Sequence, residues 1–142
     1  MCIRDRHNTI PFTSFENILP TYSILKNFIQ TEGKDINKDN MLVISPDTGA
    51  MDRAVYYANV LGLDVGMFYK RRDHSMIVDG KNPIIQHEYI GRPLEGKSVL
   101  IIDDMIASGE SVLDIIKELK SRGAANIYVA CTFAFFTEGR CV

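Results

Sequence analysis

Short apolar runs alternate with amphipathic segments along this chain. The runs are rich in aliphatic and β-branched residues: Met41 to Ser45, Leu63 to Tyr69, Ile84 to Tyr89, Ser98 to Ile102 and Ile127 to Phe136. Continuous apolar runs of this length favour strands buried on both faces, which occur mostly in parallel sheets. The pattern therefore predicts an α/β fold in which helices flank a parallel sheet.

Helical spacing is clearest after the fourth of these runs. From Glu110 onward, apolar residues recur at i, i+3, i+4 and i+7 and a glycine follows them, namely Val112, Ile115, Ile116, Leu119 and Gly123. This spacing places the apolar side chains on one face of a helix, and a glycine is a common stop. A second helix-like run extends from Asp52 through Leu61.

The amino-terminal part of the chain predicts one more helix. Ile18, Tyr22, Leu25 and Ile29 form an apolar face, and Pro20 suits the start of a helix better than its interior. Two polar, glycine-containing stretches predict connections without regular structure: a linker at Thr31 to Asn40 and a loop at Asp73 to Asn82.

Candidate chemistry is concentrated between the Ser98 to Ile102 run and the helix that begins near Glu110. Asp103 and Asp104 are expected at the carboxyl end of the strand, where ligands bind in open α/β sheets. Adjacent carboxylates can accept hydrogen bonds from vicinal hydroxyls or hold a hydrated cation. Small residues and a helix N-terminus follow, which favour close approach of a phosphate. The pattern predicts a sugar-phosphate site, and the alternative is a serine-capped helix preceded by solvated acids.

This segment resembles a known fingerprint. Residues 102 to 111, IDDMIASGES, are similar to the ribose-5-phosphate-binding motif of the type I phosphoribosyltransferase fold. The resemblance implies that Asp103 and Asp104 hold ribose hydroxyls. It also implies that a loop holds the 5-phosphate, made of Ala107, Ser108, Gly109, Glu110 and Ser111. That fold serves phosphoribosyl transfer to a base and the synthesis of phosphoribosyl diphosphate from ATP and ribose 5-phosphate.

A second motif favours the synthesis reaction. Ser45 to Ala50 resembles the Ser-Pro-Asp-x-Gly segment of ribose-phosphate diphosphokinases, which lies beside metal and diphosphate. The resemblance implies a diphosphate loop at Asp47, Thr48 and Gly49, with Asp47 as a hard oxygen ligand for Mg²⁺. Gly49 would leave backbone amides open to phosphate oxygens. Considered without the first motif, the same residues are an ordinary turn signal.

Basic residues follow the Leu63 to Tyr69 run. Lys70 and Arg72 resemble the Lys-x-Arg of the diphosphokinases, which starts a mobile loop that closes on the reacting phosphates. The resemblance implies that both residues are catalytic, because positioned cations stabilise the charge that develops during diphosphoryl transfer. The alternative is a basic cluster that faces water.

The resemblance extends from about His7 to Gly139 and implies a fragment of a larger enzyme. The expected enzyme transfers diphosphate from Mg-ATP to C1 of ribose 5-phosphate and releases AMP, in nucleotide biosynthesis. Residues 7–142 are expected to form most of its second domain, truncated at both ends, and residues 1–6 a non-native leader. The resemblance also implies an absent amino-terminal domain, a homo-oligomer in the full-length protein, and no turnover by this chain alone.

Two positions depart from the diphosphokinase pattern. Ala107 replaces a usual acid and Glu110 replaces a usual glycine, which brings the loop closer to that of phosphoribosyltransferases. Transfer from phosphoribosyl diphosphate to a nucleobase therefore stays open as an alternative. A receiver-type signalling domain is a remote alternative, because the strand and acid pair also resemble its Mg²⁺ pocket. Only Asp114 follows in the next helix, where a receiver would carry its phosphate-accepting acid on a later strand.

Composition narrows the range of partners. The chain is 46% hydrophobic and 24% charged, with a net charge of -2, so it is a poor candidate for binding nucleic acid. Its longest apolar stretch is far shorter than the roughly 20 residues of a membrane span. The three cysteines are odd in number and scattered, which argues against disulfides and a zinc site and favours the cytoplasm.

Overall fold

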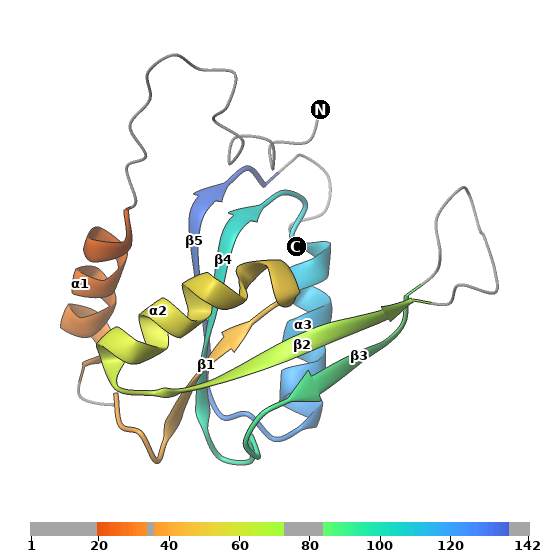
Figure 1. Ribbon diagram of the computed structural model, residues 1–142, viewed down its shortest axis with the longest axis horizontal. Coiled ribbons are helices and arrows are strands. Elements are labelled where there is room, and N and C mark those ends of the chain that lie inside the picture. Colours follow the sequence, from red (N-terminus) through yellow and green to blue (C-terminus); the bar gives the residue numbers. More distant parts are fainter. Residues whose placement is uncertain (1–19, 34–35, 73–83, 137–142) are drawn as a thin grey trace.

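A five-stranded sheet lies between helices that cover its two faces (Figure 1). The computed structural model describes residues 20–33, 36–72 and 84–136, and only the backbone at 70–72 and 84–87. The strands are β1 (Met41–Ser45), β2 (Asp64–Arg72), β3 (Ile84–Ile90), β4 (Ser98–Ile106) and β5 (Ile127–Ala134). The helices are α1 (Thr21–Glu32), α2 (Met51–Leu61) and α3 (Glu110–Ser121), with a 3₁₀ turn, η2 (Thr48–Ala50), before α2.

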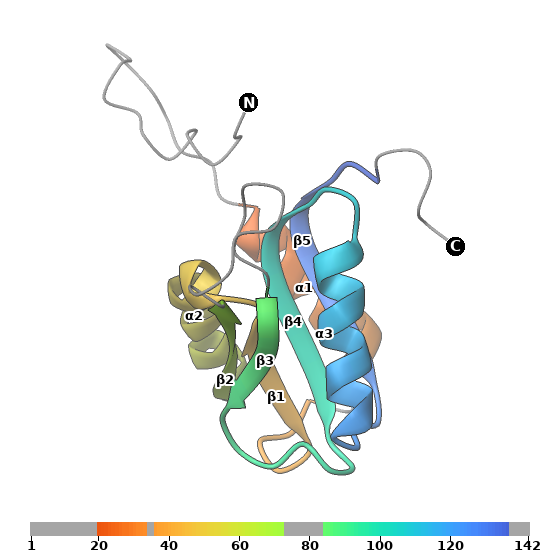
Figure 2. The same ribbon diagram turned by 90° about the vertical axis from the view of Figure 1, so that its right-hand side faces the viewer.

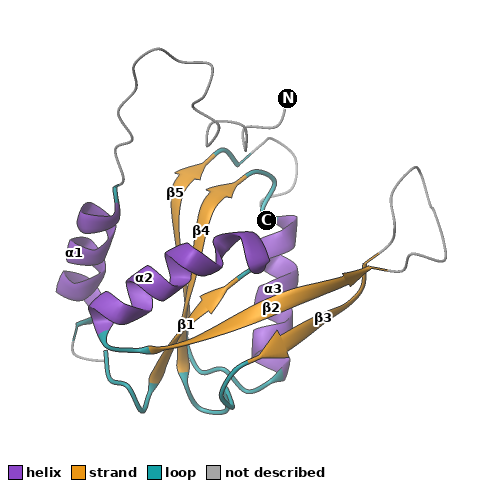
Figure 3. Ribbon diagram, in the orientation of Figure 1, coloured by secondary structure: helices purple, strands orange, loops and turns teal. Residues whose placement is uncertain are grey.

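The strand order is β3-β2-β1-β4-β5 (Figure 3). β1 lies parallel to β2 and β4, and β4 lies parallel to β5, whereas β3 runs antiparallel to β2. The predicted α/β fold with a parallel sheet is confirmed, with β3 as an antiparallel strand at one edge. β1 therefore lies at the centre of the sheet, which explains why all five of its residues are buried.

Side chains alternate along the central strands and divide the core into two layers. Met41 and Val43 of β1 pack in one cluster with α1 and α2, whereas Leu42 and Ile44 pack in the other with α3. Figure 2 shows α2 and α3 on opposite faces of the sheet. The same alternation holds along β4, where even-numbered Leu100 and Ile102 face α2 and odd-numbered residues face α3.

Two predicted strands end three or more residues later in the structure, whereas β3 ends one residue later and β5 two residues earlier. β4 continues past Ile102 to Ile106 because its backbone stays paired with β5, in register from Val99 with Ile127 to Ile106 with Ala134. β2 continues past Tyr69 to Arg72 because it pairs with β3. Both extensions come from strand pairing, which overrides the local polarity on which the predicted boundaries were based.

The apolar face predicted for the first helix is only partly right. Leu25 is buried, but Tyr22 is 73% exposed and Ile29 is also exposed, and Ile18 lies outside the described residues. The face that packs is formed by Ile24, Leu25 and Phe28, because Phe28 meets the ring of Tyr128 edge-on at 5.5 Å between centroids.

Of the two predicted connections, only the linker falls mostly within the described residues. α1 extends to Glu32, two residues into the expected linker, and the loop predicted at Asp73 to Asn82 lies outside the described residues. Within the described ranges, no helix has both the length and the apolar character needed to cross a membrane.

Candidate functional site

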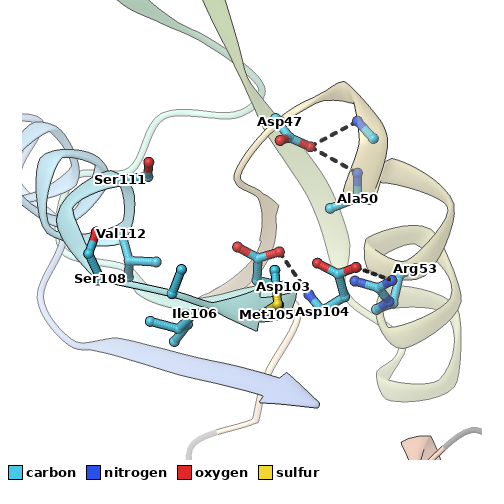
Figure 4. Close-up of a pocket in the computed structure, with 13 residues that line it drawn as sticks. Asp47, Ala50, Arg53, Asp103, Asp104, Met105, Ile106, Ser108, Ser111 and Val112 are labelled. Carbon is cyan, nitrogen blue, oxygen red and sulfur yellow. Dashed lines mark hydrogen bonds and ion pairs between the residues drawn. The ribbon is translucent and has the colours of Figure 1, made fainter. Parts of the chain in front are cut away.

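A cavity of about 320 Å³ opens at the carboxyl ends of β1 and β4 (Figure 4). Its walls come from the turn after β1, the start of α2, the end of β4 and the turn before α3. It brings together most of the site residues expected from the sequence: Asp47, Gly49, Asp103, Asp104, Ala107, Ser108, Gly109 and Ser111. Two sequence motifs more than 50 residues apart therefore form one polar cavity.

Four expected site residues lie elsewhere or are only partly described. Thr48 and Glu110 are exposed and do not line the cavity. Lys70 and Arg72 are the last residues of β2, where their backbones pair with β3, so the expected start of a loop at Lys70 is wrong. Pairing with His87 and Ile84 keeps this stretch in the sheet.

The acid pair lies within β4, before the strand ends. Asp103 pairs with Cys131 of β5, so the carboxylates are placed by the sheet ladder. Adjacent residues of a strand point to opposite faces. Asp104 accordingly lies on the face of α2, and Asp103 lies on the face of α3 and its preceding turn (Figure 4). The two carboxylates therefore lie on opposite faces of the sheet.

Asp103 has the most perturbed environment of the described acids. Burial, together with the negative charges of Asp104 and Asp47, raises the pKa of its carboxyl to about 6. Its Oδ1 accepts a hydrogen bond from the backbone N–H of Asp104 at 2.7 Å, which opposes this rise. A carboxyl with a pKa close to neutrality can both accept and donate a hydrogen bond to a ligand hydroxyl.

Asp47 organises the turn after β1. Its Oδ1 accepts hydrogen bonds from the backbone N–H groups of Gly49 at 2.9 Å and Ala50 at 3.1 Å, so it caps η2. In this structure the Asp47 carboxylate occupies these amides, and the expectation that Gly49 leaves them open to phosphate oxygens stays a prediction. Asp47 still faces the cavity, and a carboxylate has further lone pairs for a cation or for its water shell.

The turn before α3 leaves the helix N-terminus facing the cavity. Gly109 is the N-cap residue, with a φ of 84° that favours glycine, and it has no side chain to cap the first turn. The hydrogen bond that Ser108 Oγ accepts from the backbone N–H of Glu110 is long, at 3.5 Å, and therefore weak. The serine-capped alternative thus receives little support, and this end of α3 suits an anion.

Arg53 is a residue of the cavity that the motifs in the sequence do not predict. Arg53 lies in the first turn of α2 and lines the cavity, with Nη2 3.8 Å from Oδ2 of Asp104. Among the described residues it is the only cationic side chain in the wall of the cavity. No local pattern in the sequence points to this residue, because it reaches the cavity only through the packing of α2 against the sheet.

The carboxylates suit a hard cation such as Mg²⁺. Within the described residues, no group of three or more acid, histidine or cysteine side chains could by itself hold a metal ion. Mg²⁺ commonly uses one or two carboxylates and completes its shell with water and substrate phosphates. Asp47, Asp103 and Asp104 around one cavity fit that mode of binding.

Comparison with known sequences identifies related proteins. Residues 13–138 match the family described as phosphoribosyl transferase domain. The chain is 33% identical over 141 residues to a ribose-phosphate pyrophosphokinase from Pyrococcus furiosus, covering 96% of this chain and 46% of that protein. It is 39% identical over 98 residues to one from Thermococcus kodakarensis, covering 69% and 32%. The chain thus spans less than half the length of these curated relatives.

Solved structures share the fold. The phosphoribosylpyrophosphate synthetase from Mycobacterium smegmatis matches with a TM-score of 0.66 and 22% identity, over 81% of this chain and 33% of that chain. A purine phosphoribosyltransferase from Pyrococcus horikoshii matches with a TM-score of 0.61 and 20% identity, over 89% and 80%.

Proposed function

Because the chain belongs to the phosphoribosyl transferase domain family, we propose that its cavity binds ribose 5-phosphate as part of a ribose-phosphate diphosphokinase. In the proposed reaction, the C1 hydroxyl of ribose 5-phosphate attacks the β-phosphorus of ATP, and AMP leaves. The observation that carries this proposal is the 33% identity to a curated ribose-phosphate pyrophosphokinase along 96% of the chain. The convergence of the two predicted motifs on one cavity supports it.

The proposal gives each half of the cavity a separate task. On the α3 side, the turn from Ala107 to Ser111 and the helix N-terminus hold the 5-phosphate, because backbone N–H groups and the helix dipole attract anions. Asp103 and Asp104 accept hydrogen bonds from ribose hydroxyls and fix the sugar above the end of β4. This orientation directs the C1 hydroxyl toward Asp47 and the turn after β1.

The second half of the proposal concerns the diphosphate. Asp47 holds Mg²⁺ or its water shell, and the cation would neutralise charge on the ATP phosphates when bound. Lys70 and Arg72 add positive charge for the transition state, as the resemblance to the diphosphokinases implies. The same proposal includes ATP as co-substrate and a cytoplasmic location. It also includes a homo-oligomeric full-length protein with a further amino-terminal domain.

Phosphoribosyl transfer to a nucleobase is the second candidate. Ala107 is the observation that favours it, because an acid is usual at this position in the diphosphokinases and this loop is closer to the phosphoribosyltransferase version. The receiver-type alternative has no such support beyond the acid pair, since the family match covers residues 13–138 as a whole.

A chimera tests the reaction and separates the two candidates. In the experiment, this chain replaces the matching segment of the Pyrococcus furiosus ribose-phosphate pyrophosphokinase, and AMP formation from ATP is assayed with and without ribose 5-phosphate. We expect AMP formation that requires ribose 5-phosphate. Changing both Asp103 and Asp104 to Asn should reduce it by about a hundredfold, because the sugar loses its orientation.

Folding of the chimera is checked by its oligomeric size and thermal unfolding beside the parent enzyme. A folded chimera that makes no AMP, but releases pyrophosphate from phosphoribosyl diphosphate and a nucleobase, would replace the first candidate by the second. A folded chimera without either activity would refute both.

A further inference from the structure

Three carboxylates face one cavity, and Arg53 is the one cationic side chain beside them among the described residues. Asp47 comes from the turn after β1, while Asp103 and Asp104 come from β4. Like charges that face one cavity repel one another, so a carboxylate without a nearby cation is favoured to turn toward bulk water. Arg53 lies beside Asp104 and opposes such a movement of this carboxylate.

The contact of Arg53 with Asp104 is electrostatic. Nη2 lies 3.8 Å from Oδ2, which is beyond hydrogen-bond distance, and the two side chains are only 28% and 25% exposed. Partial burial weakens screening by water and salt, so the attraction is stronger than between fully exposed ions. Arg53 comes from the first turn of α2, the layer that faces the same side of β4 as Asp104.

From this geometry we propose that Arg53 is a positioning residue for sugar recognition: it holds the Asp104 carboxylate at the cavity wall, ready to accept a ribose hydroxyl. The proposal rests on the proposed ribose 5-phosphate site and adds a residue to it. Arg53 acts through Asp104 and leaves anion binding to the turn before α3, on the other face of the sheet. Loss of Arg53 should therefore weaken sugar binding and spare phosphate binding.

Calorimetry on the 142-residue chain separates these effects with two probes, ribose 5-phosphate and inorganic phosphate, both measured with Mg²⁺. In Arg53→Met we expect the affinity for ribose 5-phosphate to fall by about tenfold, because the Asp104 carboxylate is then no longer held in place to accept a hydrogen bond from the ribose hydroxyl. The affinity for inorganic phosphate should stay unchanged, and that result also shows that the turn before α3 is still folded.

Three further variants sharpen the test. Arg53→Lys should restore most of the ribose 5-phosphate affinity, because a contact of 3.8 Å depends on charge rather than on guanidinium geometry. Arg92→Met is the matched control, since Arg92 pairs with Asp64 at 2.8 Å outside the cavity, and it should change neither affinity. Combining Arg53→Met with Asp104→Asn should add little to the effect of Asp104→Asn alone, because the two residues act together.

Each outcome decides between explanations. Equal loss of both probes in Arg53→Met would overturn the proposal and assign Arg53 to direct anion binding. Unchanged affinity for ribose 5-phosphate would also overturn it. If the folded wild-type chain binds ribose 5-phosphate no better than inorganic phosphate, the ribose site itself fails, together with the role of Arg53.

Discussion

Two neighbouring residues of one type have different environments in this protein. Asp104 faces Arg53 on the side of α2, whereas burial and the nearby acids raise the pKa of Asp103 to about 6. Sequence proximity makes the two acids look interchangeable. The strand separates them, since its alternation directs each carboxylate into a different layer.

The raised pKa of Asp103 makes a prediction about stability. Below the unfolded pKa of 3.8 the carboxyl is protonated in both states, and this favourable situation is lost as the pH rises through about 6, because the folded protein must then hold a partly buried charge. Asp103→Asn should therefore stabilise the chain by about 1 kcal/mol at neutral pH, after allowance for solvent screening. Near the unfolded pKa the difference should be small.

Thermal unfolding of both proteins, in buffers below and above the titration of Asp103, measures this effect. Asp114→Asn is the control, because Asp114 is an exposed acid of α3 that pairs with Lys117 at 3.4 Å. Equal stabilisation of Asp103→Asn at both pH values would contradict the assignment of the effect to ionisation.

At the residue scale, most of the residues that line the cavity could be predicted from the sequence, but the cationic Arg53 could not. The acids, serines and glycines were identifiable because they form continuous motifs beside predicted strand ends. Arg53 reaches Asp104 only through the packing of α2 against the sheet, and no local pattern encodes that contact. The engagement of the Gly49 amide by Asp47 likewise depends on the η2 turn, which is too short to be read from periodicity.

The secondary structure elements follow the hydrophobic pattern most closely where they are central. β1 has the predicted bounds, and α3 begins at the predicted Glu110. The largest differences are at the ends of β2 and β4, because pairing with a neighbouring strand extends them through charged residues, whereas β5 ends at Ala134, two residues before the predicted Phe136. Local composition can indicate where a strand begins, but the partner strand determines where it ends.

Helix α3 offers a matched pair of substitutions. Leu119 is fully buried between α3 and the sheet, whereas Leu113 on the same helix is 43% exposed. Leu119→Ala should lower the free energy of unfolding by about 2–5 kcal/mol, because it leaves a cavity in the core. Leu113→Ala should change it by less than about 0.5 kcal/mol. Urea titrations of the two variants measure the difference, and similar losses would mean that α3 does not pack as described.

The molecule as a whole exposes apolar surface at one edge of its sheet. In the described part of the chain, β5 pairs with β4 alone, and its outer end carries Phe133, with Phe135 just beyond at 4.6 Å between ring centroids. An unpaired strand edge beside exposed aromatic rings favours association with other chains.

We therefore expect the isolated chain to self-associate as its concentration rises. Phe133→Lys combined with Phe135→Lys should reduce this association, because charged residues on an edge strand oppose pairing. Leu113→Lys, at an exposed position of α3, is the control. Sedimentation velocity over a range of concentrations measures the effect, and association that is unchanged by the double variant would place the contact elsewhere.

The position of the two acids on opposite faces of β4 also bears on how such a cavity can evolve. Changes in α2 reach the site through Arg53 and Asp104, whereas changes in the turn before α3 reach the anion half. Ala107 and Glu110, the two departures from the diphosphokinase pattern, both lie in or next to the turn before α3, although only Ala107 lines the cavity. If the site acts as we propose, substitutions in the turn before α3 can change anion binding and leave the contacts to the sugar unchanged.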